Sequence, residues 1–489
     1  MRAIVIGAGV GGIAAAIRTA RLGYGVTVLE RADGPGGKLS TFRLGGYRFD
    51  RGPSLFTMPH YVDELFALCG EDPRAHFAYR REDVVCRYFW DDGDALVAYA
   101  DPDRFSAEAA RVFGVERDRV AGALARSRKK YELSGRTFLE KPLHRAGTWL
   151  TRDNLPALRA LGEMDLATTM HAANARDLGH PKLVQLFDRF ATYNGSNPYR
   201  APGILTIIPT FEHLLGTFLP RGGMYDITRG LVALAERQGV RFRYGADVRA
   251  VLSEGDTVTG VRLADGEQLP CDLLVSNADV HGFYARLMPQ ADAPLRTLRQ
   301  ERSTSAVIFY WGVRGDSDAL GLHNIFFSRD YRGEFDALQA GAISDDFTVY
   351  VNVTSKGVRG EAPAGTENWF VMVNAPYDRG QDWPAVLSRI RAQTIAKVSA
   401  RLGVDLEAAI DVEHTWTPPE IATDTGSHLG ALYGTSSNSR WAAFLRHRNR
   451  SKQYGNLFFV GGSVHPGGGV PLALLSAKVA AGLMPAAHA

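Results

Sequence analysis

The apolar residues near the N-terminus follow two different spacings. Residues 3–6 form a short continuous apolar run, which is typical of a buried strand. From residue 10 to residue 22 the apolar side chains recur at helical spacing, which places Val10 and Ile17 on one face. Two glycines follow, and residues 26–30 then read as a second strand. The pattern predicts a β-α-β unit that begins within the first few residues.

The rest of the chain divides into regions of different hydrophobic period. Residues 101–180 have an amphipathic helical pattern without a strand signal. Between residues 240 and 275 the period changes to two, and turn residues separate short strands in a meander. Strands are also expected in 301–312, 347–374 and 457–460, and helices in 386–402 and 470–483. No repeat or long linker separates these regions, so we expect the domains to be interleaved.

A glycine-rich turn links the first strand to the first helix. It contains Gly7, Gly9 and Gly12 in G-x-G-x-x-G spacing, and the acidic Glu30 ends the second strand. Such glycines permit a tight turn, the approach of the backbone to a pyrophosphate and close packing of the helix on the strand. The helix N-terminus favours an anion, and Glu30 is placed to accept hydrogen bonds from a ribose. The arrangement predicts a dinucleotide site, and by itself it does not distinguish FAD from NAD.

Two later segments carry glycines that suit a planar cofactor. Gly36, Gly37 and Lys38 follow the acidic strand, and Lys38 is either a cofactor contact or an ordinary surface lysine. Near the C-terminus a predicted strand leads into residues 461–469, which are rich in glycine, and Pro471 then starts a helix at a position that proline favours. The N-terminus of that helix would stabilise negative charge, such as that of a reduced flavin.

Composition narrows the class of protein. The 56 Lys and Arg nearly balance the 53 Asp and Glu, which argues against a dedicated nucleic-acid-binding protein. Three cysteines without C-x-x-C spacing argue against a zinc site or a disulfide framework, and no spacing of acidic residues and histidines suggests a metal. No apolar run approaches the ~20 residues that cross a bilayer, and the N-terminal run is too short for a signal peptide. We therefore expect a soluble or peripheral protein.

The C-terminal segment resembles the signature of the bacterial carotenoid desaturases, the family of phytoene desaturases and hydroxycarotenoid 3,4-desaturases. The resemblance extends over nearly the whole chain and includes the N-terminal fingerprint and residues 189–202, 219–225 and 276–279. It implies FAD as the cofactor. It also implies an α/β fold, in which a doubly wound, Rossmann-type FAD-binding domain is interleaved with a mixed-sheet substrate domain and a helical cap.

The resemblance also suggests domain boundaries and site residues. The FAD-binding domain would be assembled from residues 1–70, 220–280 and 411–489, the helical cap and substrate region from 71–219, and the substrate-domain sheet from 281–410.

The adenosine and phosphates would be held by Gly7, Gly9, Gly12, Glu30 and Lys38. Ser54 and Leu55 would flank the flavin, Val248 would contact the adenine through its backbone, and Asn277 would lie by the nucleotide. The isoalloxazine and ribityl chain would be lined by Gly462, Ser463, Gly469 and Val470. Ser463 departs from the acidic residue that many flavoproteins of this architecture carry, which leaves its role open.

The implied reaction is dehydrogenation of a CH₂–CH₂ unit next to a polyene in a C40 carotenoid. Residues 434–439 and 461–469 resemble the hydroxycarotenoid desaturases more than the phytoene desaturases, which are the alternative. Carotenoid isomerases or saturases, amine oxidases and a non-enzymatic prenyl-lipid-binding escort protein are further alternatives, and the intact Glu30 disfavours the escort.

Oxygen or a quinone is the expected electron acceptor because no second dinucleotide fingerprint is present. We assign no catalytic base, and we expect His465 to fix its loop by hydrogen bonding.

Three further segments bear on substrate and location. Glu212 and His213 follow an apolar run and would be polar groups in a lipid-lined cavity or part of an exposed turn. Residues 138–150 mix apolar and basic side chains, and would contact an anionic membrane surface or pack as a helical hairpin. The basic run at 446–452 would be a solvated face or a phosphate clamp. Since a long hydrocarbon rarely crosses water, we expect a cytoplasmic protein that associates peripherally with the inner face of the membrane.

Overall fold

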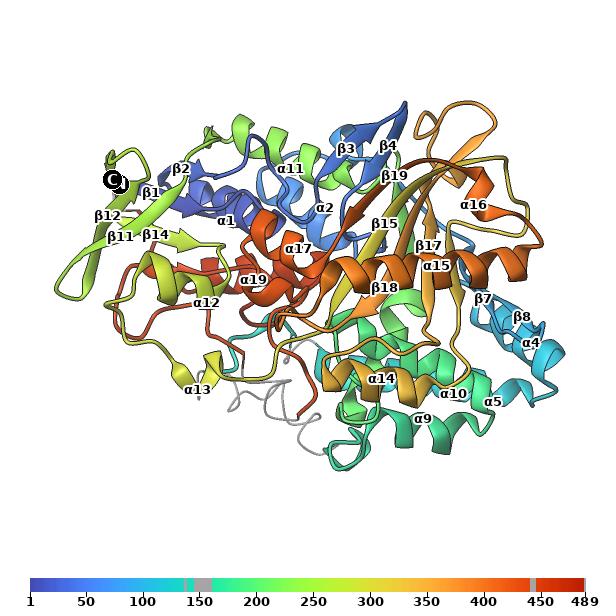
Figure 1. Ribbon diagram of the computed structural model, residues 1–489. Coiled ribbons are helices and arrows are strands. Elements are labelled where there is room, and N and C mark those ends of the chain that lie inside the picture. The colour runs from blue at the N-terminus through green and yellow to red at the C-terminus, as the bar shows by residue number, and fades with distance from the viewer. Residues whose placement is uncertain (136–138, 145–160, 440–445, 488–489) are drawn as a thin grey trace.

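The computed structural model describes residues 1–135, 139–144, 161–439 and 446–487. A parallel sheet with the strand order β10-β2-β1-β14-β20 is built from segments far apart in the sequence (Figure 1). Its strands are β1 (Arg2–Ile6), β2 (Gly25–Leu29), β10 (Arg241–Arg243), β14 (Leu273–Ser276) and β20 (Leu457–Phe459). These segments fall in the three pieces expected for the cofactor domain, whose boundaries remain a prediction.

The parallel sheet is covered on both faces because its strands are apolar on both. In β1, Ala3 and Val5 join one buried cluster and Ile4 and Ile6 join another. The first face packs against helices α1 (Val10–Arg21), α11 (Tyr225–Arg237) and α19 (Val470–Ala481). The second face is covered mainly by the antiparallel meander of β11 (Val248–Glu254), β12 (Thr257–Leu263) and β13 (Gln268–Pro270). The predicted β-α-β unit and the predicted meander are both confirmed.

A second sheet has seven strands in the order β19-β15-β18-β17-β16-β7-β8. They are β7 (Val84–Phe89), β8 (Ala95–Tyr99), β15 (Ser305–Arg314), β16 (His323–Phe326), β17 (Val349–Val353), β18 (Thr366–Ala375) and β19 (Ile410–Trp416). The sheet is mixed, as predicted, because β16 pairs with β7 in parallel while the other pairs are antiparallel. The expected boundary at residue 411 falls inside β19, so residues 411–416 belong to this sheet.

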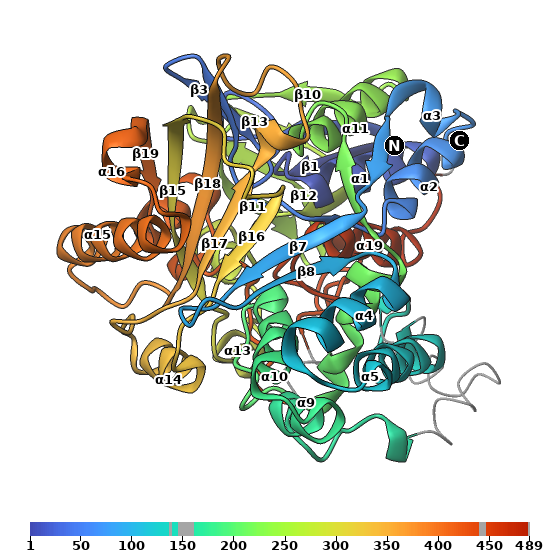
Figure 2. The ribbon, with the colours of Figure 1, turned by 90° about the vertical axis from the view of Figure 1, so that its right-hand side faces the viewer.

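A layer of helices packs against the seven-stranded sheet (Figure 2). It contains α4 (Pro102–Phe113), α5 (Arg117–Lys130), α9 (Met170–Leu178) and α10 (Pro181–Asp188). Phe105 of α4 and Leu183 of α10 share one buried cluster with Phe309 and Trp311 of β15. The cluster joins the helical layer and the sheet into one core. The helical region predicted between residues 101 and 180 is confirmed for its described part.

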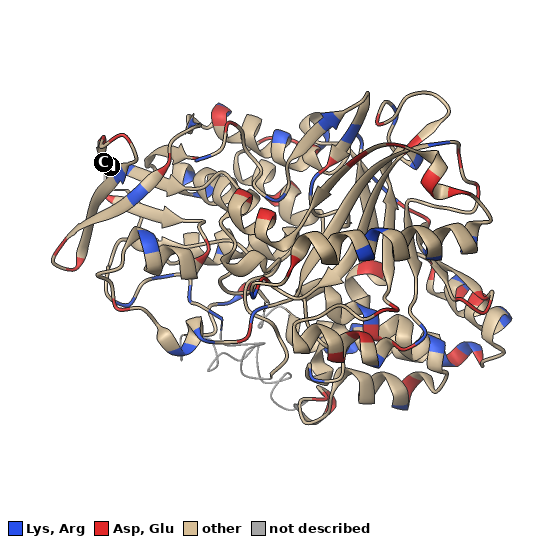
Figure 3. Cartoon of the chain, viewed as in Figure 1, with Lys and Arg blue, Asp and Glu red and all other residues tan. Residues whose placement is uncertain are grey.

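The remaining strands form two small antiparallel sheets. β3 (Thr41–Leu44) pairs with β4 (Tyr47–Asp50), and β9 (Thr217–Pro220) lies between β5 (Phe56–Thr57) and β6 (Tyr79–Arg81). The other helices are α2 (His60–Leu68), α3 (Pro73–His76), α12 (Val280–Gly282), α13 (Leu295–Leu298), α14 (Tyr331–Ala340), α15 (Trp383–Leu402), α16 (Leu406–Ala409) and α17 (Pro418–Thr425). Among the described residues, no helix has the length and apolar character needed to span a bilayer. Acidic and basic residues are interspersed over the elements (Figure 3).

Candidate active site

A cavity of about 940 Å³ extends from the parallel sheet to the seven-stranded sheet. Ile6 of β1 and Leu29 of β2 line it at one end, and Ile325 of β16 and Met372 of β18 line it at the other. Ligand sites are commonly clefts or cavities of about 300–1,000 Å³. The cavity therefore has room for a large ligand, and its two ends are built by different sheets.

The start of α1 forms one wall of the cavity, and its glycines are required by packing. Gly7 has a φ of +94°, which favours glycine. A Cβ on Gly9 would lie 2.7 Å from Nδ2 of Asn277, and a Cβ on Gly12 would lie 2.0 Å from the carbonyl oxygen of Gly7. Gly12 thus allows the helix to pack on the strand, as the spacing predicts. Gly9 and Asn277 line the cavity side by side.

Glu30 follows β2 and lines the same end of the cavity. Its Oε2 accepts a hydrogen bond of 2.7 Å from the backbone N–H of Ala8, and its Oε1 accepts one of 2.9 Å from the N–H of Ala32. These bonds fix the carboxylate at the edge of the glycine turn. Val248, at the start of β11, lines the cavity as well. The structure therefore brings Glu30, Val248 and Asn277 to one end of the cavity.

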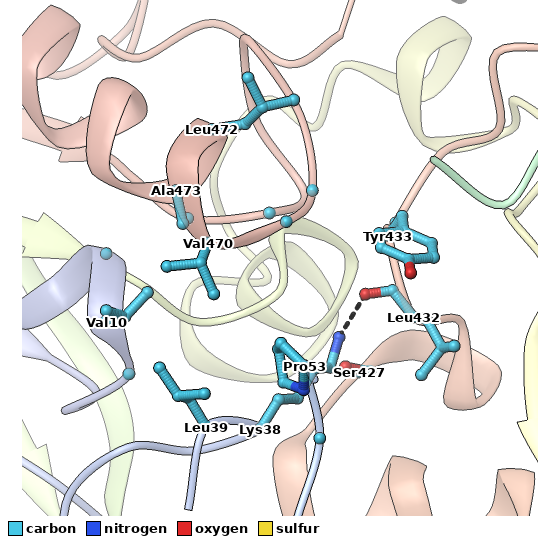
Figure 4. A pocket seen from close by; sticks show the side chains of 18 of the residues that line it. Val10, Lys38, Leu39, Pro53, Ser427, Leu432, Tyr433, Val470, Leu472 and Ala473 are labelled. Carbon is cyan, nitrogen blue, oxygen red and sulfur yellow. Dashed lines mark hydrogen bonds between the residues drawn. The ribbon is translucent and has the colours of Figure 1, made fainter. Parts of the chain in front are cut away.

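Lys38 lies inside the cavity wall rather than on the surface. Its Nζ donates a hydrogen bond of 2.7 Å to the carbonyl oxygen of Leu432, drawn as the dashed line in Figure 4. Burial lowers the pKa of Lys38 to about 8, and the negative charge of Asp279 offsets part of this effect. The amine is consequently close to the point at which it loses its proton at neutral to mildly basic pH.

The loop after β20 forms the wall that faces α1. Gly462 and Ser463 line the cavity, and the Ser463 hydroxyl oxygen accepts a 3.1 Å hydrogen bond from the N–H of Val280. Gly469 has a φ of +101° and ends the loop, and α19 starts at Val470, as predicted. Figure 4 shows Val470 of α19 and Val10 of α1 on adjacent sides of the cavity. Two helix N-termini therefore contribute to one site.

His465 holds this loop in place. Its Nε2 lies 2.9 Å from the carbonyl oxygen of Lys141, its backbone N–H donates to the carbonyl of His447, and its own carbonyl accepts from Nδ2 of Asn449. Burial lowers the pKa of His465 to about 4. The ring is neutral at pH 7 and donates from Nε2, which is the loop-fixing role expected from the sequence.

Ser54 and Leu55 line the middle of the cavity. The Ser54 hydroxyl lies 2.8 Å from the Tyr350 hydroxyl, which in turn lies 2.7 Å from Nδ1 of His323. Burial and the positive charge of Arg189 lower the pKa of His323 to about 3, so this histidine is neutral. A chain of hydrogen-bonding groups thus runs from Ser54 along β17 to β16.

The far end of the cavity is lined by several apolar side chains, and a buried polar group of residues lies beside them. Ile204, Ile207, Ile208 and Phe211 are among the apolar lining residues. Beside them the side chains of Arg189, Tyr193 and Glu212 line the cavity. The Tyr193 hydroxyl donates to Oε2 of Glu212 over 2.7 Å, and Nη2 of Arg189 lies 3.6 Å from the same oxygen. Burial raises the pKa of Glu212, and the charge of Arg189 opposes that rise.

Comparison with known proteins identifies the family. The model of the flavin-containing amine oxidoreductases matches residues 10–484. The chain is 45% identical over 489 residues to a 1-hydroxycarotenoid 3,4-desaturase from Flavobacterium sp., with 100% of both chains covered. It is 32% identical to a zeta-carotene-forming phytoene desaturase from Myxococcus xanthus, with 100% of this chain and 95% of that one covered. The chain belongs to the carotenoid desaturase family of the flavin-containing amine oxidoreductases. Its cofactor is FAD.

A solved structure shows the same fold at low identity. A variant of putrescine oxidase is 13% identical to this carotenoid desaturase family member, with a TM-score of 0.64 and 98% of each chain covered. An identity this low speaks for the fold alone. The predicted α/β flavoprotein architecture is therefore confirmed.

The residues at the two helix N-termini fit FAD. No side chain caps α1 or α19, and neither helix has an acidic residue in its first turn. Such N-termini leave backbone N–H groups and positive dipole ends available to anions. Glu30 supplies the carboxylate that suits a ribose, and the missing Cβ of Gly9 leaves room for close approach. The contacts that each of these residues makes with FAD remain a prediction.

Several cavity residues of this family member were not assigned by sequence reasoning. Tyr350 lies in a strand whose apolar pattern only predicts burial. His323 lies in β16, which the hydrophobic pattern did not predict, and nothing local marks either residue as a cavity residue. Arg189 belongs to a segment used for the resemblance, but its role was not identified. Arg446 of the basic run is buried, lines the cavity and donates to the carbonyl oxygen of Tyr433, so at this residue the solvated-face alternative is wrong.

The structure places Glu212 and His213 fully, and the segment 138–150 only in part. Glu212 lines the cavity, whereas His213 is buried against Phe105, with ring centroids 4.7 Å apart. Both residues are buried, so the exposed-turn alternative is wrong. Of the proposed membrane segment, residues 138 and 145–150 lie outside the described residues. Leu139 lines the cavity. Leu143 would have to be exposed if this segment inserted its apolar side chains into a bilayer, and it is only 5% exposed.

Proposed function

We propose that this protein is an FAD-dependent hydroxycarotenoid 3,4-desaturase, which introduces a C=C bond into a C40 polyene that carries a hydroxyl group. The observation that carries the proposal is the cavity itself. Uncapped helix N-termini and Glu30 lie at one end of it, and apolar side chains beside a buried polar group of residues lie at the other. The 45% identity to a 1-hydroxycarotenoid 3,4-desaturase, against 32% to a phytoene desaturase, favours the hydroxylated substrate.

The residues of this chain would bind and orient FAD and the polyene substrate, and they would not carry out the oxidation themselves. When bound, FAD supplies the two-electron oxidation, which is chemistry that cofactors carry. Gly7, Gly9, Gly12, Glu30 and Lys38 would hold the adenosine and phosphates, and Val248 and Asn277 would flank the nucleotide. Ser54, Leu55, Gly462, Ser463, Gly469 and Val470 would position the ring. The apolar residues at 204–211 would align the polyene and exclude water.

The substrate and its membrane source form a second part of the proposal. Each CH₂ moved into water costs about 0.8 kcal/mol, so a C40 chain would cost on the order of 20 kcal/mol or more. We infer that the enzyme acts as a peripheral protein at the cytoplasmic face of the membrane and takes its substrate from the bilayer. Oxygen or a quinone would receive the electrons.

Anaerobic titration of the purified, FAD-loaded protein with a 1-hydroxycarotenoid tests the function. We expect bleaching of the oxidised flavin bands and a product two mass units lighter. Phytoene should bleach the flavin far more slowly. Faster reaction with phytoene would favour a phytoene desaturase, an isomer of unchanged mass would favour an isomerase, and bound carotenoid without bleaching would favour an escort protein.

A further inference from the structure

The polar group of residues at the apolar end of the cavity contains two charged side chains that are buried. We call Arg189, Tyr193 and Glu212 the polar corner. Arg189 is 7% exposed and Glu212 is 1% exposed. Arg189 follows α10, and Glu212 lies in the short helix Thr210–Leu214, so two separate segments bring the charges together. Buried charges are costly unless they are paired and hydrogen-bonded. The hydrogen bonds of Arg189 and Glu212 therefore show which of their donors and acceptors the protein leaves without a partner.

The guanidinium group of Arg189 has more donors than the protein satisfies. Arginine carries five N–H donors. Nη2 donates to the hydroxyls of Tyr88 and Tyr193, at 2.9 and 3.2 Å. In the described part of the chain, Nε has no acceptor and Nη1 has none either. A buried side chain that lines a cavity and keeps free donors is suited to a ligand oxygen.

Glu212 offers the complementary acceptor. Its Oε2 receives the hydrogen bond of Tyr193 and lies 3.6 Å from Nη2 of Arg189. Its Oε1 receives no hydrogen bond from the residues that the structure describes. The corner therefore presents free donors and a free acceptor within one small region, next to the apolar side chains of Ile207, Ile208 and Phe211.

We propose that the polar corner recognises an alcohol hydroxyl on the end of the polyene substrate. Arg189 donates to the hydroxyl oxygen, and the hydroxyl donates to Oε1 of Glu212. A carboxylate or phosphate would be repelled by Glu212, and an ammonium group by Arg189. A ketone accepts but cannot donate, and an unsubstituted hydrocarbon leaves both partners without a hydrogen bond. This assignment rests on the proposed function and names the group by which the substrate would be selected.

The test compares a 1-hydroxycarotenoid with the same polyene lacking the hydroxyl, using the FAD-loaded enzyme. Sites built around a substrate hydroxyl can reject the analogue that lacks it by 10⁴ or more, and we expect the wild type to favour the hydroxylated polyene in kcat/KM by roughly 100-fold or more. Glu212→Gln keeps the shape of the side chain and one oxygen that can accept from Tyr193, but it puts an NH₂ donor in place of the other oxygen. It should reduce this ratio at least about tenfold. Arg189→Gln should act in the same direction.

Ile208→Val is the matched control because it changes an apolar cavity residue without touching the corner. It should alter kcat/KM for both polyenes by the same factor. The retained flavin absorption spectrum checks that each variant is folded. Equal kcat/KM of the wild type for the two polyenes, or variants that slow both equally, would overturn the proposal, and water would then be the partner of the corner.

Binding separates a failure of the corner from a failure of the proposed function. The Kd of each polyene for the oxidised holoenzyme is measured from the shift of the carotenoid absorption bands. If the wild type binds the hydroxylated polyene more tightly but reduces no flavin, the proposed function fails and the corner stands. If flavin is reduced equally by both polyenes and both bind equally, the function stands and the corner fails.

Discussion

Lys38 donates its hydrogen bond to the carbonyl of Leu432, a residue 394 positions later in the chain. The bond joins the glycine segment after β2 to the loop that leads into the C-terminal part of the cofactor site. Because the amine is buried and its pKa is lowered to about 8, it is partly deprotonated in mildly basic solution. The charge of this lysine is therefore sensitive to what binds beside it.

FAD affinity should fall as the pH rises above about 8. Only the protonated amine attracts the phosphates, and an anion bound nearby raises the pKa of Lys38, so binding takes up a proton. Above the free-protein value near 8 the affinity should decrease by up to about tenfold per pH unit. Titration of the FAD-free protein from pH 7 to 10 measures the slope. Lys38→Gln should bind FAD more weakly and without this slope; an unchanged slope in the variant would assign the titration to another group.

Replacing Gly9 should abolish FAD retention. A Cβ at this position would lie 2.7 Å from Asn277 Nδ2, and the branched side chain of Gly9→Val would fill the approach to the helix N-terminus. Gly34→Ala is the control because a Cβ there has open space around it. The ratio of flavin to protein absorbance after purification measures the effect. A Gly9→Val protein with stoichiometric flavin would show that FAD binds elsewhere.

The features of the fold and of the candidate site that follow from a local sequence pattern could be predicted. The features that depend on long-range packing could not. The spacing of Gly7, Gly9 and Gly12 is dictated by one turn, so the sequence is sufficient to interpret it. The apolar run before Glu212 marks it as a polar group of a lipid-lined cavity. Its pairing with Arg189 depends on how the chain between them folds back, and no local pattern marks Arg189 as its partner. The same holds for Ser54 and Tyr350, which meet although 296 positions separate them.

A carboxylate in the first turn of α19 should make the flavin harder to reduce. Gly469 is a poor site for the test because its φ of +101° would strain any side chain, whereas Leu472 lies in the first turn and lines the cavity. Charges at helix ends contribute up to about 2 kcal/mol, so Leu472→Asp should lower the two-electron potential by roughly 10–40 mV. Leu472→Asn has the same shape without the charge and should leave the potential nearly unchanged. Equal potentials for the two variants would show that the α19 dipole does not influence the flavin potential.

His465 should influence stability without shaping the pH dependence of turnover. Its pKa near 4 keeps it neutral across the working range, and its ring donates to the carbonyl of Lys141. His465→Ala should cost about 1–3 kcal/mol of unfolding free energy through the orphaned carbonyl. Since the unfolded histidine takes up a proton near pH 6.5, this residue lowers stability as the pH falls from 6.5 towards 4, and the variant should lose that part of the acid sensitivity. A kcat profile that loses a limb in the variant would instead assign His465 a proton-transfer role.

Membrane association should depend on the segment that contains Trp149. Leu143 is buried and its replacement would damage the core, so the test uses Trp149→Asp, with Leu295→Asp on α13 as the comparison because Leu295 is 54% exposed. Aromatic and basic residues together favour the interface of an anionic bilayer. We expect the wild type and the Leu295 variant to co-sediment with vesicles of anionic lipid, and the Trp149 variant to remain largely in the supernatant. The reverse result would show that α13 contacts the membrane. If the wild type stays in the supernatant and desaturates lipid-free substrate at full rate, the enzyme does not take its substrate from the membrane.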